Sequence, residues 1–499
     1  MKLLELFNPF PEAMLPEENP EVSGIQLDSR AIKPGDVFVA LTGSQRDGRK
    51  YISSAVDAGA LAILVDTPLV EKIDVPVVVL ADLQSKLGAV ATHFFKHPSS
   101  HLALVGVTGT NGKSSVCEYI RQLSEALGKK SASIGTLGFY LGEEKMPLIN
   151  TTPDVLSVNA LLAQCADKGA SLAAMEVSSH ALVQQRVQGV VFDTAVFTNL
   201  SQDHLDYHHS MVEYARAKSE LFKLPGLSKA IINIDDGYSD LMLAAVPTSV
   251  DCYQFSLKNS GADAYLSCIE WQVDGVCEAQ LHLLGECERI RTSLIGEFNL
   301  YNLLAAALVL RLQGFSLASI AEGIAFIRGV DGRMEKVSNH EGILALVDYA
   351  HTPDALENVL KTLNAQRKMQ QRTGQIYTVF GCGGDRDKGK RPQMGKVASL
   401  LSDHVWVTSD NPRSEEPMAI CRDVVEGIDK TNFDIIESRE AAIHAAVYQA
   451  RVGDILLVAG KGHEKTQTLG ADVRHFDDVE ELHKAFARKM AENKERACH

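Results

Sequence analysis

Short apolar runs rich in β-branched residues alternate with helix-like segments along this chain, and this alternation constrains the fold more than any other feature. Continuous apolar runs of this length are typical of strands that are buried on both faces, with helices covering those faces. The pattern therefore predicts an α/β protein built around parallel sheets. The segment Tyr265–Gly296 alternates polar and apolar residues instead and predicts an antiparallel insert. The expected strands include Leu61–Val65, Val77–Leu80, Leu102–Val107, Ala173–Val177, Ala230–Ile234, Ile343–Val347, Tyr377–Phe380, His404–Thr408 and Ile455–Ala459.

The chain length and two turn-rich segments predict how the domains are divided. At about 150 residues per domain, 499 residues correspond to roughly three domains. Pro98 and its serine neighbours precede the run at Leu102, and the glycine-rich segment Arg328–Arg333 precedes the next series of strands. Both segments have the composition of linkers. We therefore expect domains at residues 1–98, 99–332 and 333–499.

The overall charge and the cysteine content narrow the class of protein. Lys and Arg number 49 against 64 Asp and Glu, which gives a net charge of −15. A general binder of nucleic acids or anionic membranes would carry the opposite sign, so we expect neither partner. Nine cysteines, an odd number without a C-x-x-C pair, indicate reduced thiols. There is no apolar run of about 18 residues, and Met1–Leu15 is a poor signal peptide, so we expect a cytoplasmic protein without a membrane span.

One glycine-rich segment predicts a phosphate-binding loop. An apolar strand leads into it and an amphipathic helix follows, which is the context that such a loop requires. Its backbone N–H groups would surround phosphate oxygens, Lys113 would reach the β- and γ-phosphates, and Ser114 would bind Mg²⁺. The strict P-loop pattern is not met, because Gly106 and Gly112 are too far apart by one residue, and a glycine-rich turn with a solvated lysine is the alternative. The residues concerned are Gly109, Thr110, Asn111, Gly112, Lys113, Ser114 and Ser115.

The segment TGTNGKS at 108–114 resembles the ATP loop of the Mur ligases, the amide-forming synthetases of peptidoglycan precursor assembly. The folylpolyglutamate synthases have a similar loop. The resemblance implies a small N-terminal α/β domain, a central P-loop ATPase-like domain with a parallel sheet, and a C-terminal Rossmann-like α/β domain. We expect a monomer, although no motif in the sequence determines the oligomeric state. It also implies ATP and Mg²⁺ as cofactors. A substrate carboxylate would attack the γ-phosphate of ATP to form an acyl phosphate, which an amine then attacks, and cations would offset the repulsion between the anions.

Three residues are candidates for the metal and catalytic chemistry. Glu176 and His204 follow apolar strands, where α/β sites gather, and both offer ligands for Mg²⁺. The alternatives are a helix cap or ion-pair partner for Glu176 and an ordinary loop histidine for His204. His204 lies near His208 and His209, but no ligand spacing supports zinc. Lys218 by itself is an ordinary helix lysine, and only the resemblance implies that CO₂ carbamylates it to hold a second Mg²⁺. Lys113, Lys218 and His204 are the expected catalytic residues.

Two further segments resemble the nucleotide-binding elements of the family. Asn299 and Asn302 share a helix face in GEFNLYN, which matches the family element beside the adenine. A helix N-cap is an equally good interpretation of Asn299. Arg333 lies in DGRME at the second domain joint, and the resemblance implies that it contacts the nucleotide and reports domain closure. A linker arginine in solvent is the alternative.

The resemblance also assigns the residues that would bind the carboxylate substrate, a UDP-N-acetylmuramoyl-dipeptide. In the tripeptide synthetases of the family, loops matching LDSR and GSQRDGR hold the uridine diphosphate, and segments matching NTTP and SSHALVQQR meet the muramoyl dipeptide. From the sequence alone, these are surface loops, a turn and a surface-helix arginine. The residues carried over are Leu27, Ser29, Ser44, Gln45, Arg46, Asn150, Thr151, Thr152, Ser178, Gln184 and Arg186.

The C-terminal segments concern the amino acid that is added. The segment DNPR at 410–413 marks the family members that add meso-diaminopimelate; by itself it is an Asn-Pro turn with an exposed arginine. Arg413 with Asn411 would bind the distal carboxylate of diaminopimelate and would repel the ammonium of lysine. Glu464 would pair with an ammonium of the amino acid and Arg386 with a carboxylate. A dinucleotide fingerprint needs glycine at 386, so a Rossmann cofactor is rejected there. The acceptor residues are Arg386, Asp410, Asn411, Pro412, Arg413, Gly460 and Glu464.

These observations predict an ATP-dependent ligase whose partners are UDP-N-acetylmuramoyl-dipeptide and meso-diaminopimelate. Three alternatives remain at this point. In a lysine-adding variant, every motif would have the role given above except the DNPR segment. A folylpolyglutamate synthase is disfavoured by the LDSR, NTTP and DNPR segments. A nucleotide-binding scaffold without activity is disfavoured by intact Lys113, Glu176, His204 and Lys218.

Overall fold

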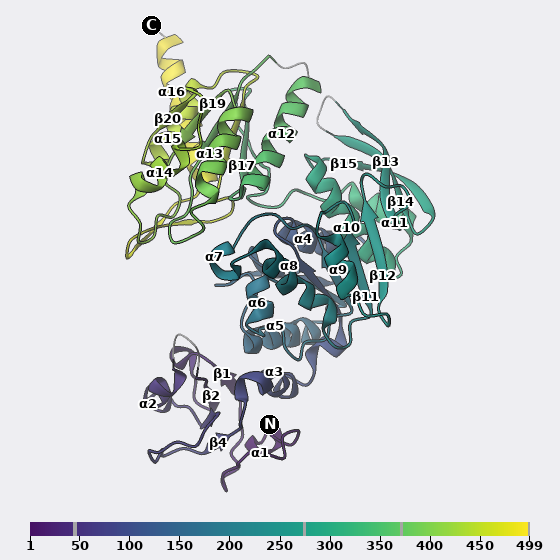
Figure 1. Ribbon diagram of the computed structural model, residues 1–499, viewed down its shortest axis with the longest axis vertical. Helices are drawn as coiled ribbons and strands as arrows, with labels where there is room; N and C mark the ends of the chain where they lie inside the picture. Colours follow the sequence, from purple (N-terminus) through teal and green to yellow (C-terminus); the bar gives the residue numbers. More distant parts are fainter. Residues whose placement is uncertain (43–46, 273–275, 370–372, 498–499) are drawn as a thin grey trace. The chain divides into compact units, whose positions relative to one another are not determined.

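The computed structural model describes residues 1–42, 47–272, 276–369 and 373–497. It divides into two compact units. Unit 1 contains Met1–Gly106, Lys129–Thr194 and Leu224–Ser228, and unit 2 contains Val107–Gly128, Ala195–Lys223 and Lys229–His499. Figure 1 labels the elements of both units along the chain. Among the described helices, none has the length and apolar character needed to cross a membrane.

Unit 1 begins with a four-stranded parallel sheet in the order β1-β2-β3-β4. Successive side chains point to opposite faces, so Val37 and Phe38 enter two different apolar clusters. Leu87 of α3 covers the first face, and Ile52 of α2 covers the second. The elements are α1 (Leu3–Leu6), β1 (Gly24–Gln26), η1 (Ser29–Ala31), β2 (Asp36–Ala40), η2 (Gly48–Tyr51), α2 (Ile52–Asp57), β3 (Ala62–Val65), β4 (Val77–Val79) and α3 (Leu83–Phe94).

The rest of unit 1 contains the strand order β9-β6-β7-β8. Strands β6 and β9 are parallel, and β7 and β8 continue the sheet in antiparallel pairing. Because β6 and β9 are parallel neighbours, Gly135 and Glu176 end at the same sheet edge. The elements are η3 (Pro98–His101), β6 (Ser131–Gly135), β7 (Gly138–Leu141), β8 (Glu144–Met146), α5 (Val155–Asp167), β9 (Leu172–Glu176) and α6 (Ser179–Val183). Strand β5 (Ala103–Thr108) begins in unit 1 and ends in unit 2.

The first half of unit 2 contains strands in the order β15-β14-β13-β12-β11-β10. Strands β13, β14 and β15 pair antiparallel, so the predicted antiparallel insert is confirmed. The strands are β10 (Thr194–Phe197), β11 (Lys229–Asn233), β12 (Asp251–Ser256), β13 (Ala264–Trp271), β14 (Cys277–Leu283) and β15 (Glu286–Thr292). The helices are α4 (Lys113–Ala126), α7 (Leu205–His208), α8 (Met211–Ser219), η4 (Glu220–Lys223), α9 (Ser239–Ala245), α10 (Glu297–Leu312) and α11 (Leu317–Ile324).

The second half of unit 2 contains a six-stranded sheet in the order β16-β17-β21-β18-β19-β20. Edge strand β16 is antiparallel to β17, and the other neighbours are parallel. The strands are β16 (Glu335–Val337), β17 (Leu344–Asp348), β18 (Ile376–Phe380), β19 (His404–Val407), β20 (Phe433–Ile435), β21 (Ile455–Ala459) and the separate pair β22 (Thr466–Leu469) and β23 (Asp472–His475). The helices are α12 (Pro353–Met369), α13 (Lys390–Leu401), α14 (Pro417–Val425), α15 (Arg439–Gln449) and α16 (Asp478–Ala497).

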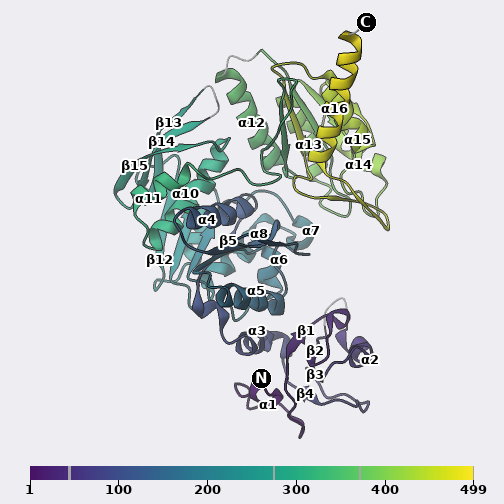
Figure 2. The ribbon, with the colours of Figure 1, turned by 180° about the vertical axis from the view of Figure 1, so that it is seen from behind.

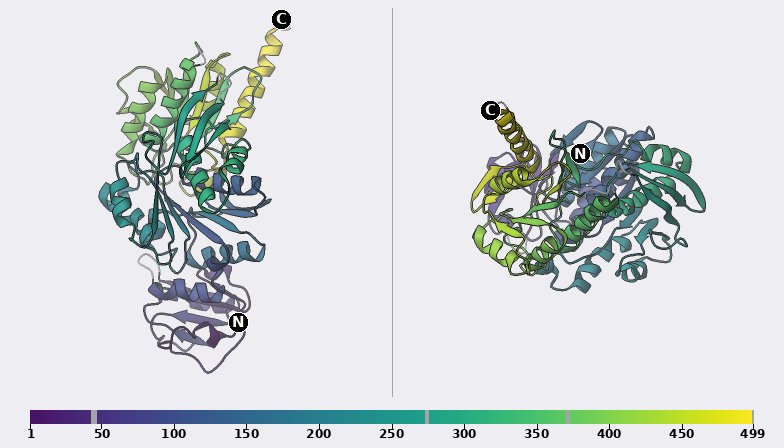
Figure 3. Two further views of the ribbon diagram at one scale, coloured as in Figure 1. Left: turned by 90° about the vertical axis from the view of Figure 1, so that its right-hand side faces the viewer. Right: turned by 90° about the horizontal axis from the view of Figure 1, so that it is seen from above.

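Helices cover both faces of this six-stranded sheet (Figures 2 and 3). One apolar cluster joins Leu346 and Leu457 to residues of α12, α13 and α14. The other joins Val347 and Val458 to residues of α15 and α16. Neighbouring strand residues enter opposite clusters, as expected of a parallel sheet buried on both sides.

The α/β class predicted from the sequence is confirmed, and each expected apolar run coincides with a strand to within a residue or two at its ends. Local sequence is sufficient for this result because a doubly buried strand needs an uninterrupted apolar run. The predicted domain boundaries at 98 and 332 stay a prediction.

Candidate active site

The ATP loop follows β5 and leads directly into α4, as the sequence predicts. Gly109 has φ +151° and Gly112 has φ +86°. A Cβ at Gly109 would lie 1.9 Å from Thr198 Oγ1, and one at Gly112 would lie 2.4 Å from Asn302 Oδ1, so a side chain fits at neither position. Thr110 N donates to the Asn199 carbonyl at 2.8 Å, which anchors the loop to the segment after β10.

Two lysines converge on this loop. Lys113 Nζ donates to the carbonyl oxygens of Gly109 and Thr110, both at 2.9 Å. Lys218 Nζ donates to the Gly109 carbonyl at 2.7 Å and lies 4.5 Å from the centre of the Tyr214 ring. Lys218 is 1% exposed. Burial and the neighbouring charge of Lys113 hold the pKa of Lys218 well below its usual value, against the opposing effect of Asp203, and this favours the neutral amine.

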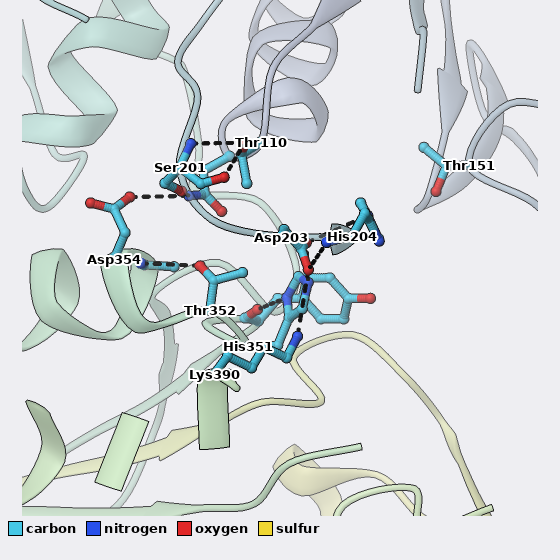
Figure 4. Close-up of polar contacts among 12 residues, drawn as sticks. Thr110, Thr151, Ser201, Asp203, His204, His351, Thr352, Asp354 and Lys390 are labelled. Carbon is cyan, nitrogen blue, oxygen red and sulfur yellow. Dashed lines mark hydrogen bonds and ion pairs between the residues drawn. The ribbon is translucent and has the colours of Figure 1, made fainter. Parts of the chain in front are cut away.

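Asp203 is the centre of a cluster of positive groups that the sequence interpretation missed. His204 Nε2, His351 Nε2 and Lys390 Nζ lie 3.4, 3.5 and 3.6 Å from its carboxylate oxygens. Figure 4 shows these side chains gathered around Asp203. Burial raises the pKa of Asp203, but the hydrogen bond from His351 and the charges of Lys390 and the histidines outweigh it and hold the pKa well below its usual value. His204 thus belongs to a charged cluster and is not an isolated loop histidine.

A cavity of about 670 Å³ opens beside the ATP loop. Its lining includes Asn111, Gly112, Asn302, Arg333 and Asp348. This volume lies within the range of small-molecule sites. Three of the predicted loop residues, Asn111, Gly112 and Ser115, therefore border one cavity with the predicted nucleotide residues Asn302 and Arg333.

The two nucleotide segments also settle the alternatives left by the sequence. Asn299 is buried inside α10 and accepts a hydrogen bond from Tyr119 OH at 3.0 Å, while Gly296 is the N-cap, so the N-cap interpretation of Asn299 was wrong. Asn302 Nδ2 contacts Asn299 Oδ1 at 3.4 Å, which confirms their shared helix face. Arg333 lies over the Tyr349 ring at 4.5 Å and its Nε is buried, so it is not a solvated linker arginine.

Asp348 is a further cavity residue that the sequence interpretation did not single out. Met334 N donates to its Oδ2 at 2.7 Å. Burial raises the pKa of Asp348 to about 6, although Arg333 and the backbone hydrogen bonds oppose the rise. Its position at the end of β17 was the available signal, because polar residues at strand ends of α/β sheets commonly form sites.

In unit 1, Glu176 lies at the end of β9 and is 2% exposed. Its Oε1 accepts from Thr136 N at 2.7 Å and its Oε2 from Thr136 Oγ1 at 3.1 Å. Ser178 caps the next helix, so the helix-cap interpretation of Glu176 was wrong. Thr136 is a second missed residue; the signal was its position between the glycines at the end of β6, the strand beside β9.

The residues predicted to meet the muramoyl dipeptide gather around Thr152 in the same unit. Thr152 Oγ1 donates to the Glu176 carbonyl at 2.8 Å and accepts from Ser178 N at 3.1 Å. Arg186 Nη1 donates to the Thr152 carbonyl at 2.8 Å, and Arg186 Nε donates to Gln184 Oε1 at 3.0 Å. Arg186 follows α6 and is not a surface-helix residue. Thr151 Oγ1 lies 3.0 Å from Thr136 Oγ1, within hydrogen-bond distance, which joins it to the same network.

The remaining residues assigned to this substrate are only partly described. Asn150 is exposed. Ser29 is buried in η1, which the carboxylate of Asp28 caps, and Leu27 packs against the apolar cluster of the N-terminal sheet. The predictions for Ser44, Gln45 and Arg46 concern residues that lie outside the described ranges.

The predicted acceptor residues form a connected polar group in unit 2. Asn411 Nδ2 donates to Glu464 Oε2 at 2.7 Å, and fully buried Lys461 Nζ lies 3.4 Å from the same oxygen. Asp410 is 7% exposed, and a Cβ at Gly460 would lie 2.6 Å from its Oδ2. Gly460 therefore permits the close approach of the two segments.

Arg413 is linked to this group through Gly384, whose N–H donates to the Asn411 carbonyl at 2.9 Å. Its φ is +52°, and its Nη1 donates to the Gly384 carbonyl at 2.7 Å. The interpretation of Arg413 as an exposed turn arginine was therefore wrong. Pro412 before it is buried, whereas Arg386 is exposed. The structure thus brings together all the predicted acceptor segments, with Arg386 at their solvent side.

Comparison with known proteins identifies the family. The chain matches the models of the Mur ligase family catalytic domain at residues 21–95, the Mur ligase middle domain at 107–310 and the Mur ligase glutamate ligase domain at 332–462. The chain therefore belongs to the Mur ligase family, as its motifs predicted, and it is a ligase.

Relatives in this family are similar over nearly the full chain. The protein named UDP-N-acetylmuramoyl-L-alanyl-D-glutamate–2,6-diaminopimelate ligase of Bacillus cereus is 39% identical over 98% of both chains. That of Xanthomonas oryzae pv. oryzae is 43% identical over 94% of both. A solved structure of a ligase with this name has 35% identity and TM-score 0.68 over 98% of this chain and 99% of the other. MurF from Acinetobacter baumannii shares the fold, with 20% identity and TM-score 0.69 over 96% and 95%.

Proposed function

We propose that this ligase joins meso-2,6-diaminopimelate to the D-Glu γ-carboxylate of UDP-N-acetylmuramoyl-L-Ala-D-Glu and hydrolyses ATP to ADP and phosphate. The reaction belongs to peptidoglycan precursor synthesis. The observation that carries the proposal is the acceptor group, in which Arg413, Asn411 and Glu464 offer a cation, an amide and a carboxylate. Asn411 donates to Glu464, and Gly384, whose carbonyl accepts from Arg413, donates its N–H to the Asn411 carbonyl. Full-length relatives that bear the corresponding name support it.

The chemistry follows from the low reactivity of a carboxylate toward amines. The γ-carboxylate attacks the γ-phosphorus of ATP, the bond to the bridging oxygen breaks, and an acyl phosphate and ADP form. The amine of diaminopimelate attacks the acyl carbon through a tetrahedral intermediate, and phosphate leaves with the bonding electron pair while the amine loses its proton. The backbone N–H groups of Gly109–Ser115 and the Lys113 ammonium would stabilise the phosphate charge in both steps.

Four residues would hold Mg²⁺, which supplies charge neutralisation at the phosphates when it is bound. Ser114 offers a hydroxyl, Glu176 a buried carboxylate and His204 an imidazole. Lys218 fits after carbamylation: its neutral amine adds to CO₂, a proton is lost, and the product is an anionic oxygen ligand. The buried position and lowered pKa of Lys218 support this proposal, because only the neutral amine attacks CO₂.

The cavity beside the ATP loop is the proposed site of the nucleoside part of ATP. Asn302 and Arg333 line it, and Asn299 supports Asn302 from within α10. The carboxylate of Asp348 would accept hydrogen bonds from ligand hydroxyl groups. Arg333 would contact the nucleotide and follow domain closure through its position on Tyr349.

The carboxylate substrate would bind through residues of the N-terminal sheet and of the Thr152 network. Leu27, which is half-buried, and Ser29, which is buried, are proposed for the uridine diphosphate, and Arg186 for an anionic group of the muramoyl dipeptide. The proposal includes three domains at 1–98, 99–332 and 333–499, a monomeric state and a cytoplasmic location. The other residues proposed for this substrate are Ser44, Gln45, Arg46, Asn150, Thr151, Thr152, Ser178 and Gln184.

The first test is ADP release with UDP-N-acetylmuramoyl-L-Ala-D-Glu, Mg²⁺ and ATP, with meso-diaminopimelate compared to L-lysine. We expect turnover with diaminopimelate alone, because the Arg413 guanidinium would face the lysine ammonium. Turnover with lysine would keep the ligase and overturn the acceptor assignment. ADP release that folate stimulates instead would favour the folylpolyglutamate alternative, and nucleotide binding without any ADP release would favour an inactive scaffold.

The variant Arg413→Ala sharpens this test. Loss of a charge-assisted hydrogen-bond pair should raise KM for diaminopimelate about 10- to 100-fold. Affinity for ATP should stay unchanged. Arg422→Ala is the matched control, because Arg422 is an exposed arginine of the same region that pairs with a surface glutamate, Glu416, at 3.0 Å. An equal KM effect in both variants would contradict the role of Arg413.

A further inference from the structure

Helices α15 and α16 carry a group of three metal-ligating side chains away from the proposed active site. Glu440 and His444 are one helical turn apart on α15, and Glu481 lies in the first turn of α16. One ligand atom from each residue lies within 4.8 Å of the other two. Among the described residues, this is the one group of three or more His, Cys, Asp or Glu side chains with that geometry.

A second observation indicates that this group is incomplete without a ligand. His444 Nε2 and Glu481 Oε2 are buried atoms without a hydrogen-bond partner. They face each other at 3.8 Å, which is too long for a hydrogen bond. The Glu481 side chain is 9% exposed, and its other oxygen, Oε1, accepts from Lys484 Nζ at 2.7 Å, so only Oε2 is directed at the group. Buried polar atoms are normally satisfied, and a bound cation would satisfy both of these at once.

We propose that Glu440, His444 and Glu481 form a binding site for a divalent transition metal of the Zn²⁺ type that ties α15 to α16. Two carboxylate oxygens and one imidazole nitrogen are a donor set that such ions accept, with water completing the shell. Bond lengths of about 2.0–2.1 Å in a tetrahedral shell require ligand atoms about 3.4 Å apart. The separation of 3.8 Å between His444 Nε2 and Glu481 Oε2 is close to that spacing. Glu440 is exposed, so rotation of its side chain would bring its carboxylate to the same spacing from the other two ligand atoms.

Charge and packing support an ion at this place. Two carboxylates face the site. The lysine beside them, Lys484, donates to Glu481 Oε1 and interacts with Glu440 as well, so a net negative charge remains. The surrounding helices are held by an apolar cluster that includes Ile443, Val447 and Leu482, so the backbone of the site is formed without metal. The metal would therefore add stability to a folded domain and would not be needed for folding.

The test is Zn²⁺ binding by the full-length protein in the presence of saturating Mg²⁺ and ATP, measured by calorimetry with ZnCl₂. The wild type should bind one equivalent of Zn²⁺ more than His444→Ala and Glu440→Gln, and Zn²⁺ should raise its Tm by more than it raises theirs. Exposed thiols and the catalytic site can also bind Zn²⁺, but the variants share that background. Glu440→Gln keeps the size of an exposed side chain, so it decides the question if His444→Ala does not fold.

His475→Gln is the matched control. His475 Nε2 pairs with Glu480 at 2.8 Å on the surface, so it is a histidine–carboxylate pair without a third ligand. It should keep the wild-type Zn²⁺ stoichiometry. X-ray absorption of the Zn²⁺-loaded wild type should show one imidazole among oxygen donors at the additional site. Equal stoichiometry and equal Tm shifts in the wild type, Glu440→Gln and His475→Gln would overturn the proposal.

Discussion

The ATP loop and the helices of the C-terminal sheet both hold basic side chains that are at least half-buried, but with different partners. At the loop, Lys113 and Lys218 donate to main-chain carbonyl oxygens. Beside the C-terminal sheet, Arg439 of α15 pairs with Asp478 of α16, and both side chains are 0% exposed. Arg391 similarly pairs with Glu415 and holds the pKa of that carboxyl down to about 2.

This difference distinguishes a cation that can bind a ligand from an ion pair that stabilises the fold. Carbonyl dipoles hold Lys113 without neutralising its charge, so a phosphate can still be attracted to it. A carboxylate neutralises the cation and fixes both side chains, which suits a frame. We therefore expect substitutions at the loop to change activity more than stability, and substitutions in the C-terminal sheet to do the reverse.

The largest effect is expected for Arg439→Met. The change leaves Asp478 as an uncompensated buried charge, which should lower the free energy of unfolding by about 3–5 kcal/mol. Urea unfolding followed by circular dichroism measures this. Arg439→Met with Asp478→Leu should recover most of the loss. If the single variant is as stable as the wild type, the assignment of this pair to the frame is wrong.

Lys113→Ala should lower kcat/KM about 1,000-fold, because one preorganised cation at the transferring phosphate is removed. The free energy of unfolding should change by less than about 1 kcal/mol. Coupled ADP-release kinetics and urea unfolding provide the two readouts. Lys129→Ala, at an exposed lysine just after the same helix, is the control. A large loss of stability without loss of turnover would break the comparison.

Asp348→Asn tests the fully buried cavity carboxylate whose pKa is raised to about 6. The folded-state pKa of about 6 exceeds the unfolded value of 3.8, so the folded state binds more protons between these values. Stability from this group is complete below about pH 4 and is lost as the pH rises to about 6. The loss is about 3 kcal/mol at most, at 1.36 kcal/mol per pKa unit. The variant should flatten this segment of the pH–stability curve, and an unchanged curve would refute the assignment.

Lys218→Met should lower turnover about 100-fold while stability stays equal or rises, since a buried amine is replaced by an apolar side chain of similar size. Because the folded pKa of Lys218 is lowered, the unfolded state binds more protons, and wild-type stability should rise with pH up to about 10.4. The variant should lose that rise.

Bicarbonate distinguishes the carbamate from a simple role as a cation. Removal of CO₂ should lower wild-type turnover, and added bicarbonate should restore it, whereas Lys218→Met should respond to neither. A ¹³C carbamate signal from labelled bicarbonate in the wild type alone would agree with this. Full activity of Lys218→Met without bicarbonate would end the carbamylation proposal.

Local sequence predicted those parts of the site that depend on neighbours in the chain. The ATP loop at 109–115 needs only a strand, two permissive glycines and a helix, and all three are readable. Asn299 shows the limit of local rules. Its residue type suits an N-cap, but Gly296, with φ +99°, is the N-cap of α10. The buried Asn299 side chain instead accepts a hydrogen bond from Tyr119.

The sequence by itself determined the α/β class, the ATP loop and the acceptor motifs, because apolar runs and turn residues act over a few positions. Only the tertiary structure decided that Asp203 meets His351 and Lys390, that Thr136 holds Glu176, and that Glu481 faces His444. These contacts join residues that are distant in the chain. Their geometry depends on the order of the strands in the sheet and on how the helices pack. The spacing of residues in the sequence does not specify either.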